Sequence, residues 1–149
     1  MSYYKKWNRK KIKKIINLTK KIALITGGTR GIGLAIKKKL IKENFRTIYT
    51  GTKNKKIKNF FQLDLNEEDS VNNFIEKIEK INIDVLIINS GINIIKNFLD
   101  FSNTEILKVI NINYLNNLRI IQSVLKKMCK KKYGRIILIS SIWGVTPAK

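Results

Sequence analysis

The 149-residue chain carries 31 lysine and arginine residues against 10 aspartate and glutamate residues, a formal net charge of +21. No run approaches the ~18 consecutive apolar residues of a membrane-spanning helix, and no apolar segment of a secretory signal follows the basic N-terminus. A single cysteine and no histidine exclude an internal disulfide and predict no metal site. The length suits one domain with a hydrophobic core, and we expect a cytoplasmic protein.

The positive charge has two explanations. Strongly basic chains are typical of proteins that bind nucleic acid or anionic membranes. However, lysine, isoleucine and asparagine together make up about half of the residues, and all three have A/T-rich codons, so a biased genome accounts for much of the lysine. The lysines are spread along the chain with few aromatic residues between them, which favours this explanation over nucleic-acid binding.

Residues 1–21 form a lysine-rich extension before the first predicted strand. Ile12, Ile15, Ile16 and Leu18 give it a partial helical stripe. It is either a surface helix that contacts an anionic membrane or a partner, or a solvated extension of the chain. The second interpretation is favoured, and residues 22–149 are predicted to form the folded domain.

A strand, a glycine-rich turn and a helix are predicted in direct succession. Ile22 to Ile25 is a short apolar run typical of a buried strand, and an amphipathic helix begins near Leu34. Between them lies TGGTRGIG, residues 26–33. Gly27 permits a tight turn, Gly31 leaves room for a pyrophosphate, and Gly33 lets the helix pack closely. The free N–H groups at the helix start then face the phosphates, which predicts a dinucleotide site.

Strand-like and helix-like segments alternate along the rest of the chain, which predicts an α/β layered fold. The link at Thr52–Asn59 is too short for a full helix. Further strands are predicted at Arg46–Thr50, Phe60–Leu65, Asp84–Ile88 and Arg135–Ile139, and helices at Ser70–Ile81 and from Asn103 to about Lys132. The core positions predicted for the last helix are Ile106, Val109, Ile110, Leu118, Ile121, Leu125 and Met128.

The TGGTRGIG loop resembles the cofactor loop of the short-chain dehydrogenase/reductase family, and the resemblance runs from about Ile22 to the last residue. It is strongest to the reductases of 3-oxoacyl chains on acyl carrier protein. It implies a Rossmann-type doubly wound parallel sheet, here truncated after the fifth strand. It also implies a nicotinamide cofactor, a small or acyl-carrier-bound carbonyl substrate, and homo-oligomers among full-length relatives.

The resemblance also implies which residues contact the cofactor. Asp64-Leu65 matches the family's adenine contact, although Asp64 is almost equally well explained as a cap of the helix that begins near Glu67. Asn89-Ser90-Gly91 matches the family's Asn-Ala-Gly near the ribose. The full predicted set is Gly27, Thr29, Arg30, Gly31, Ile32, Gly33, Lys53, Asp64, Leu65, Asn89, Ser90 and Gly91.

The segment after the second predicted strand bears on the choice of cofactor. Folds that prefer NAD usually place an acid there, roughly 20 residues past the glycines, to hold the ribose hydroxyls. Residues 49–53, YTGTK, contain none. Arg30 and Lys53 are both able to meet a 2′-phosphate, which favours NADP(H) with NAD(H) possible. In the alternative, Lys53 is one lysine among many in a charged loop.

The chemistry of a nicotinamide reductase requires a hydrogen-bond donor on the carbonyl oxygen and an acid beside it. The resemblance implies an Asn, Ser, Tyr and Lys set. Asn113 matches the asparagine, and Ser141, at the end of GRIILISS, matches the serine. The alternatives are a chance asparagine and an ordinary turn serine.

The family's Tyr-x-x-x-Lys has no counterpart beyond Ser141. Tyr49 and Lys53 have the spacing, but they lie upstream, on the adenosine side. We therefore expect the N-terminal part of a short-chain reductase that is inactive as it stands. The main alternative is a dinucleotide-binding module without catalysis, and a basic nucleic-acid-binding protein is a more distant one.

Overall fold

The computed structural model describes residues 20–144. The predicted basic extension therefore lies outside the described residues, apart from Lys20 and Lys21. Within the described part, no helix combines the length and the apolar character needed to cross a membrane.

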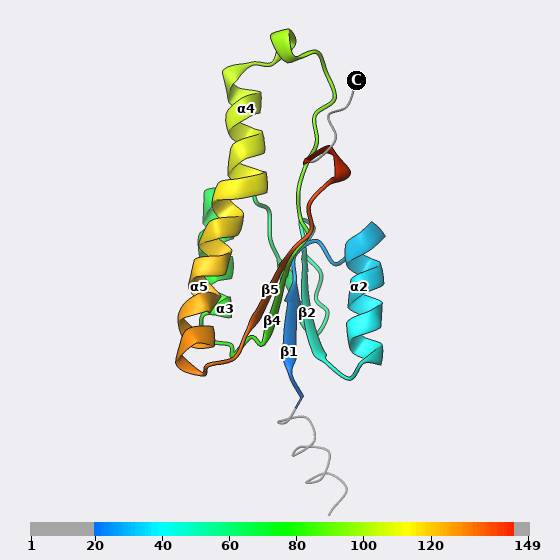
Figure 1. Ribbon diagram of the computed structural model, residues 1–149, viewed down its shortest axis with the longest axis vertical. Helices are drawn as coiled ribbons and strands as arrows, with labels where there is room; N and C mark the ends of the chain where they lie inside the picture. Colours follow the sequence, from blue (N-terminus) through cyan, green and yellow to red (C-terminus); the bar gives the residue numbers. More distant parts are fainter. Residues whose placement is uncertain (1–19, 145–149) are drawn as a thin grey trace, which may run out of the picture.

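Five parallel strands form one sheet in the order β3-β2-β1-β4-β5 (Figure 1). The first strand lies in the middle, so the chain winds outward in both directions from β1, and the predicted Rossmann-type doubly wound sheet is confirmed. The register pairs Ile22 with Arg46 and Ile88 with Leu138. The strands are β1 (Ile22–Ile25), β2 (Arg46–Gly51), β3 (Phe60–Gln62), β4 (Val85–Ile88) and β5 (Arg135–Leu138).

Helices cover both faces of this sheet (Figure 1). Helix α2 (Gly31–Lys42) lies on one face, and α3 (Glu68–Ile78) and α5 (Asn116–Lys130) lie on the other. Alternate strand residues supply the two cores, as a sheet buried on both sides requires. Leu24 and Leu86 pack with the α3 and α5 side, whereas Ala23, Ile25 and Ile87 pack with residues of α2.

The amino ends of β1 and β4 are joined by a carboxylate. Asp84 accepts hydrogen bonds from the Ile22 backbone N–H at 2.7 Å and from the Lys131 ammonium at 2.6 Å. Lys131 also donates to the Ile83 carbonyl at 2.7 Å. The Asp84 backbone N–H in turn donates to the Ile22 carbonyl at 2.8 Å, so this partly buried acid fixes the register of β1, β4 and the end of α5.

The link between β2 and β3 contains no helix, as the sequence predicts. β3 is shorter than the predicted Phe60–Leu65, because β2 ends at Gly51, which pairs with Gln62 and accepts the last ladder bond from the Leu63 N–H at 3.0 Å. Helix α3 also begins two residues before its predicted start at Ser70.

The long predicted helix is present, but its predicted core face is wrong. It comprises α4 (Asn103–Ile110), a π-helical turn η2 (Asn111–Leu115) and α5, without a break. The face that packs on the sheet carries Ile112, Ile120, Val124 and Met128. Ile106, Ile110, Leu118 and Leu125 are exposed, Val109 and Ile121 are half-buried, and of the predicted core residues Met128 alone is fully buried. The helix has two apolar stripes, and the sequence pattern does not distinguish which one meets the sheet.

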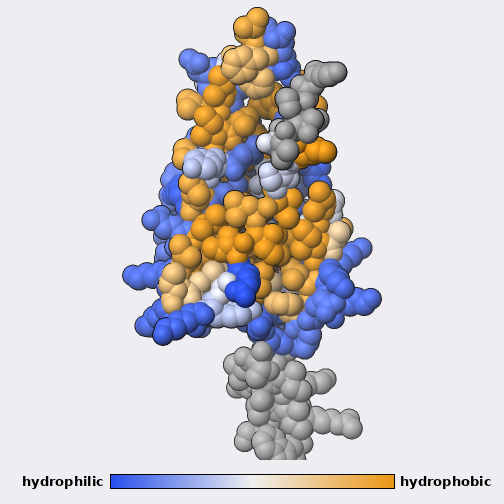
Figure 2. Space-filling model, in the orientation of Figure 1, coloured by the Kyte–Doolittle hydropathy of each residue, from blue (hydrophilic) through white to orange (hydrophobic). Residues whose placement is uncertain are grey.

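β5 forms one edge of the sheet in the described part of the chain. Its residues Ile137 and Leu138 are 47% and 59% exposed. Figure 2 shows a hydrophobic surface in this region, between the α5 and α2 sides of the molecule. An exposed apolar strand edge of this kind favours association with other chains.

Candidate cofactor site

A groove of about 540 Å³ opens at the carboxyl ends of the strands, where the strand order reverses beside β1. This is the position at which doubly wound sheets bind their ligands. All predicted cofactor residues except Lys53 and Asp64 line it. The full lining is Gly27, Thr29, Arg30, Gly31, Ile32, Gly33, Gly51, Thr52, Leu65, Asn89, Ser90, Gly91, Ile92 and Ile112.

The glycine loop has the geometry that its sequence predicts. Gly27 and Gly31 have positive φ values of 70° and 53°, which side chains other than glycine rarely adopt. A Cβ atom on Gly33 would collide with the carbonyl oxygen of Gly27, whereas a Cβ on Gly31 would meet nothing within 4 Å. Gly33 therefore permits close packing, and Gly31 leaves open space in front of the backbone.

The start of α2 faces this open space. Arg30 is extended, with φ −151° and ψ 171°, and its side chain makes no capping hydrogen bond. No acidic residue lies in the first turn of the helix. The N–H groups of this turn and the positive end of the helix dipole therefore remain available to an anion.

A polar bridge joins the end of β1 to the end of β4. The hydroxyl of Thr26, a fully buried residue, accepts hydrogen bonds from the backbone N–H groups of Asn89 at 2.9 Å and Ser90 at 3.0 Å. The Asn89 amide donates in return to the carbonyls of Thr26 at 3.0 Å and Gly27 at 3.3 Å. The sequence motif does not reveal this role of Thr26, although a threonine directly between a buried strand and a glycine turn is consistent with it.

Asn113 is docked on the wall of the groove. Its side-chain oxygen accepts from the backbone N–H of Ile92 at 2.8 Å, and its amide donates to the Ile92 carbonyl at 2.8 Å. A Cβ on Gly91 would lie 3.2 Å from the same oxygen. Asn113 does not itself line the groove, but it holds Ile92, which does, and it lies beside Gly91, which also lines the groove.

Ser141 lies, like the groove, at the carboxyl ends of the strands. It follows β5, whose residue Leu138 pairs with Ile88 immediately before Asn89. The Ser141 carbonyl accepts the Gly144 N–H at 3.0 Å in a short helical turn. Ser141 is outside the groove lining, beyond its β4 wall.

Tyr49 and Lys53 are far from Ser141. β1 and β4 separate β2 from β5, so Tyr49 is at least three strand spacings, ~14 Å, from the β5 edge. Its ring packs edge-on against Phe60, with centroids 5.4 Å apart, and the Lys37 ammonium lies 3.9 Å from its centroid. The prediction that Tyr49 lies in a strand is confirmed, and that strand, β2, is separated from β5 by two others.

Lys53 and Asp64 stand outside the groove lining, although Thr52 and Leu65 beside them belong to it. The Asp64 carboxylate accepts the Asn66 backbone N–H at 2.9 Å in a local turn. The N-cap position of α3 is Glu67, so the alternative that Asp64 caps this helix is wrong. Four further lining residues are not predicted by the sequence motifs, because each lies next to a motif rather than within one: Gly51, Thr52, Ile92 and Ile112.

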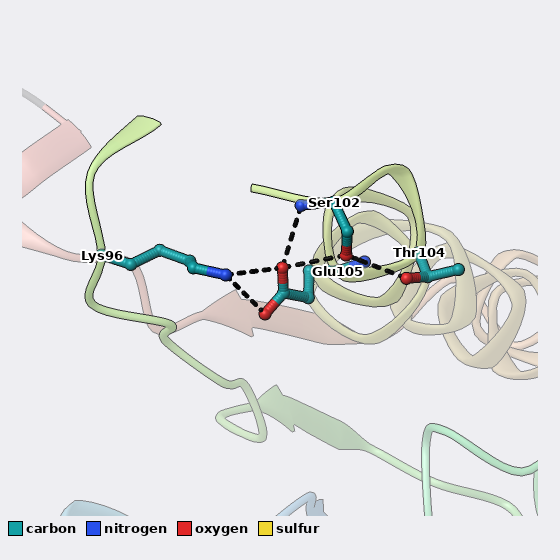
Figure 3. Close-up of polar contacts among 4 residues, drawn as sticks. All are labelled: Lys96, Ser102, Thr104 and Glu105. Carbon is teal, nitrogen blue, oxygen red and sulfur yellow. Dashed lines mark hydrogen bonds and ion pairs between the residues drawn. The ribbon is translucent and has the colours of Figure 1, made fainter. Parts of the chain in front are cut away.

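The loop that leads from the groove to α4 is anchored by Glu105 (Figure 3). Its carboxylate accepts from the Ser102 backbone N–H at 2.9 Å and from Lys96 at 2.9 and 3.0 Å, and the Ser102 hydroxyl accepts the Glu105 N–H at 3.2 Å. This is a capping box. The Ser102 backbone N–H, followed by Lys96 and the Ser102 hydroxyl, lowers the pKa of Glu105 from 4.5 to about 2.

A doubly wound parallel sheet whose first strand turns through glycines into a helix defines a dinucleotide-binding protein. The model of the short chain dehydrogenase family matches residues 21–149. The chain therefore belongs to the short-chain dehydrogenase family.

Named relatives agree with this assignment. The chain is 35% identical to the 3-oxoacyl-[acyl-carrier-protein] reductase of Aquifex aeolicus, over 88% of this chain and 59% of that protein. Among solved structures, ElxO with NADP bound has a TM-score of 0.76 at 33% identity, over 87% of this chain and 58% of the other. A 4-hydroxyisoleucine dehydrogenase complexed with NADH has a TM-score of 0.76 at 29% identity, over 86% of this chain and 59% of the other. The chain thus spans less than two thirds of each.

The anchored loop predicts a specific acid titration. Because folding lowers the pKa of Glu105, its contribution to stability is complete above pH ~5 and disappears as the pH falls through about 2. We expect a ¹³C NMR titration of the Glu105 carboxyl to give a midpoint near 2. Lys96→Met raises it only in part, since the Ser102 N–H remains. A midpoint near 4.5 in the unmodified protein would exclude the capping box in solution.

Proposed function

We propose that this chain supplies the cofactor-binding part of an NAD(P)H-dependent oxidoreductase that interconverts a carbonyl and an alcohol. The observation that carries the proposal is the groove at the start of α2, where the N–H groups of the first turn and the positive-φ residue Gly31 face open space. Such a site suits a pyrophosphate. When bound, a nicotinamide cofactor supplies or accepts a hydride.

The chain's own polar residues have distinct roles in this proposal. The Ser141 hydroxyl donates a hydrogen bond to the substrate carbonyl oxygen, which stabilises the negative charge that develops there. Asn113 holds Ile92 in place on the groove wall through its two bonds to the backbone of that residue. Asn89 and Thr26 fix the adjoining ends of β4 and β1.

NADP(H) is the preferred cofactor in this proposal. Arg30 is exposed at the groove, and no carboxylate lies among the lining residues, which include Gly51 and Thr52 at the end of β2. A cation and the lack of an acid at this place favour a 2′-phosphate over a free ribose hydroxyl. ElxO, one of the similar structures, has NADP bound.

The substrate class follows from the relatives. The curated relatives of about 35% identity are reductases of 3-oxoacyl groups on acyl carrier protein. We propose a thioester-linked 3-oxoacyl group as the substrate of the whole enzyme. This part of the proposal depends on the likeness alone.

A dinucleotide-binding module without catalysis is the second candidate. Of the tyrosines in these 149 residues, Tyr49 alone is followed by a lysine four positions later, and it lies across the sheet from Ser141. No Tyr-x-x-x-Lys within the described residues is therefore placed to protonate a carbonyl held by Ser141.

Cofactor binding should depend on Gly33. Gly33→Ala places a Cβ against the Gly27 carbonyl, so we expect the loop to shift and NADPH affinity to fall at least about tenfold, a loss of ~1.4 kcal/mol. Calorimetric titration measures this. Gly144→Ala, where a Cβ meets only an ordinary contact at 3.7 Å, is the matched control and should bind as the unmodified chain does. The proposal fails if the unmodified chain binds neither NADPH nor NADH.

The cofactor preference should depend on Arg30. Loss of a charged hydrogen bond costs about 1.5–3 kcal/mol, so Arg30→Ala should weaken NADPH binding roughly tenfold to a hundredfold and leave NADH binding within about twofold. Lys53→Ala should act in the same direction but less strongly, because Lys53 is outside the lining. Lys126→Ala, on α5, controls for net charge. Equal weakening of both cofactors by Arg30→Ala would refute the proposed preference.

The two candidate functions differ in turnover. If a proton donor is missing, reduction of an acetoacetyl thioester by NADPH should be slower by about 10²–10⁴ than in the Aquifex reductase. The purified 149-residue polypeptide and that reductase are compared by NADPH absorbance. Binding without turnover supports the module. Turnover comparable to that of the reductase would exclude it and would show that another group donates the proton.

A further inference from the structure

The helix that carries Asn113 changes its hydrogen-bonding pattern at this residue. In the turn η2 the backbone N–H of Asn116 donates to the Asn111 carbonyl, five residues back. A helix that returns from this pattern to the ordinary four-residue step passes over one carbonyl, which then lacks its N–H partner. Single π-helical turns are rare and are frequently found at functional sites. Because the pattern is uncommon, the residues around this turn must stabilise it.

Asn117 is one such residue. It is 4% exposed, and its side-chain amide donates to the carbonyls of Ile112 and Asn113, both at 3.1 Å. These two carbonyls belong to the π-helical turn itself. We propose that Asn117 is a positioning residue, which holds the π-helical turn in the register that docks Asn113 on the backbone of Ile92.

Asn117 affects the groove indirectly, through Ile112. Asn117 does not line the groove, but Ile112, whose carbonyl it holds, does. Each residue of an α-helix adds ~100° of rotation. Relaxation of the turn to regular α-helix would therefore rotate Asn113 away from Ile92 and break both of its bonds. The part of the inference that concerns cofactor binding rests on the proposed function.

The contribution of Asn117 to stability is reduced by its own side-chain oxygen. The side-chain oxygen of Asn117 is buried and has no hydrogen-bond partner among the described residues. Asn117→Leu keeps a similar shape and removes this unsatisfied acceptor together with the donor. The variant also leaves the Ile112 carbonyl without its side-chain donor, a loss that removal of the unsatisfied acceptor offsets only in part, so we expect it to fold with a somewhat lower melting temperature than the unmodified protein.

The test follows the amide proton of Ile92, which donates to Asn113. In Asn117→Leu, hydrogen exchange at Ile92 measured by NMR should accelerate at least about fivefold, as loss of one hydrogen bond implies. Ser123→Ala is the matched control, because it removes a side-chain bond to the Ile120 carbonyl in the same helix but outside the turn. It should leave exchange at Ile92 unchanged.

A conservative variant separates positioning from packing. The hydroxyl in Asn117→Thr can donate to the carbonyl four residues back, that of Asn113, and should restore part of the protection at Ile92. NADPH affinity should fall about threefold to tenfold in Asn117→Leu, and less in Asn117→Thr. Unchanged Ile92 exchange in Asn117→Leu would overturn the inference. Because exchange is measured without cofactor, failure of NADPH binding would refute the proposed function separately.

Discussion

The bridge between Thr26 and Asn89 is the interaction on which the groove depends. Strands β1 and β4 are neighbours in the sheet, yet their chains diverge at their carboxyl ends, one into the glycine loop and the other into the loop after Gly91. Beyond the ladder, backbone N–H and carbonyl groups need new partners. One threonine hydroxyl and one asparagine amide satisfy four of them. These side chains take the place of further strand pairing as hydrogen-bond partners of the backbone at the base of the groove. The two strands can therefore separate there, and the groove stays open.

The same solution recurs around the groove. Thr50 accepts the Gly27 N–H at 3.1 Å, Asn113 holds both backbone groups of Ile92, and the Asn116 amide donates to the Leu65 carbonyl at 2.9 Å. Each bond joins a side chain on a regular element to the backbone of a loop that lines the groove. Short polar side chains suit this purpose because they reach one backbone group with little loss of rotamer freedom. The abundance of asparagine in this chain therefore has structural as well as compositional significance.

Motifs with fixed backbone requirements could be predicted from the sequence, whereas choices between equivalent surfaces could not. The glycine loop could be predicted because few other residues fit the positions of Gly27 and Gly33. The five strands could be predicted from their short apolar runs. The buried face of α4 and α5 could not be predicted, since both apolar stripes satisfy the helical period and the π-helical turn changes the phase between them. Lys53 illustrates a second limit. Its distance from the groove depends on how a helix-free link leaves β2, which spacing alone leaves undetermined.

The few acids of this basic chain lie at the ends of its helices and strands and not at the groove. Asp84 accepts a backbone N–H of β1 and the ammonium of Lys131, directly after α5. Glu105, at the start of α4, accepts the Ser102 backbone N–H and the ammonium of Lys96 from the preceding loop. Each thus neutralises one lysine and also completes the end of an element. Most lysines are exposed, where water screens their repulsion. Since no acid lines the groove, the uncompensated charge of the chain adds to the helix dipole of α2, and both favour an anionic ligand at the glycine loop.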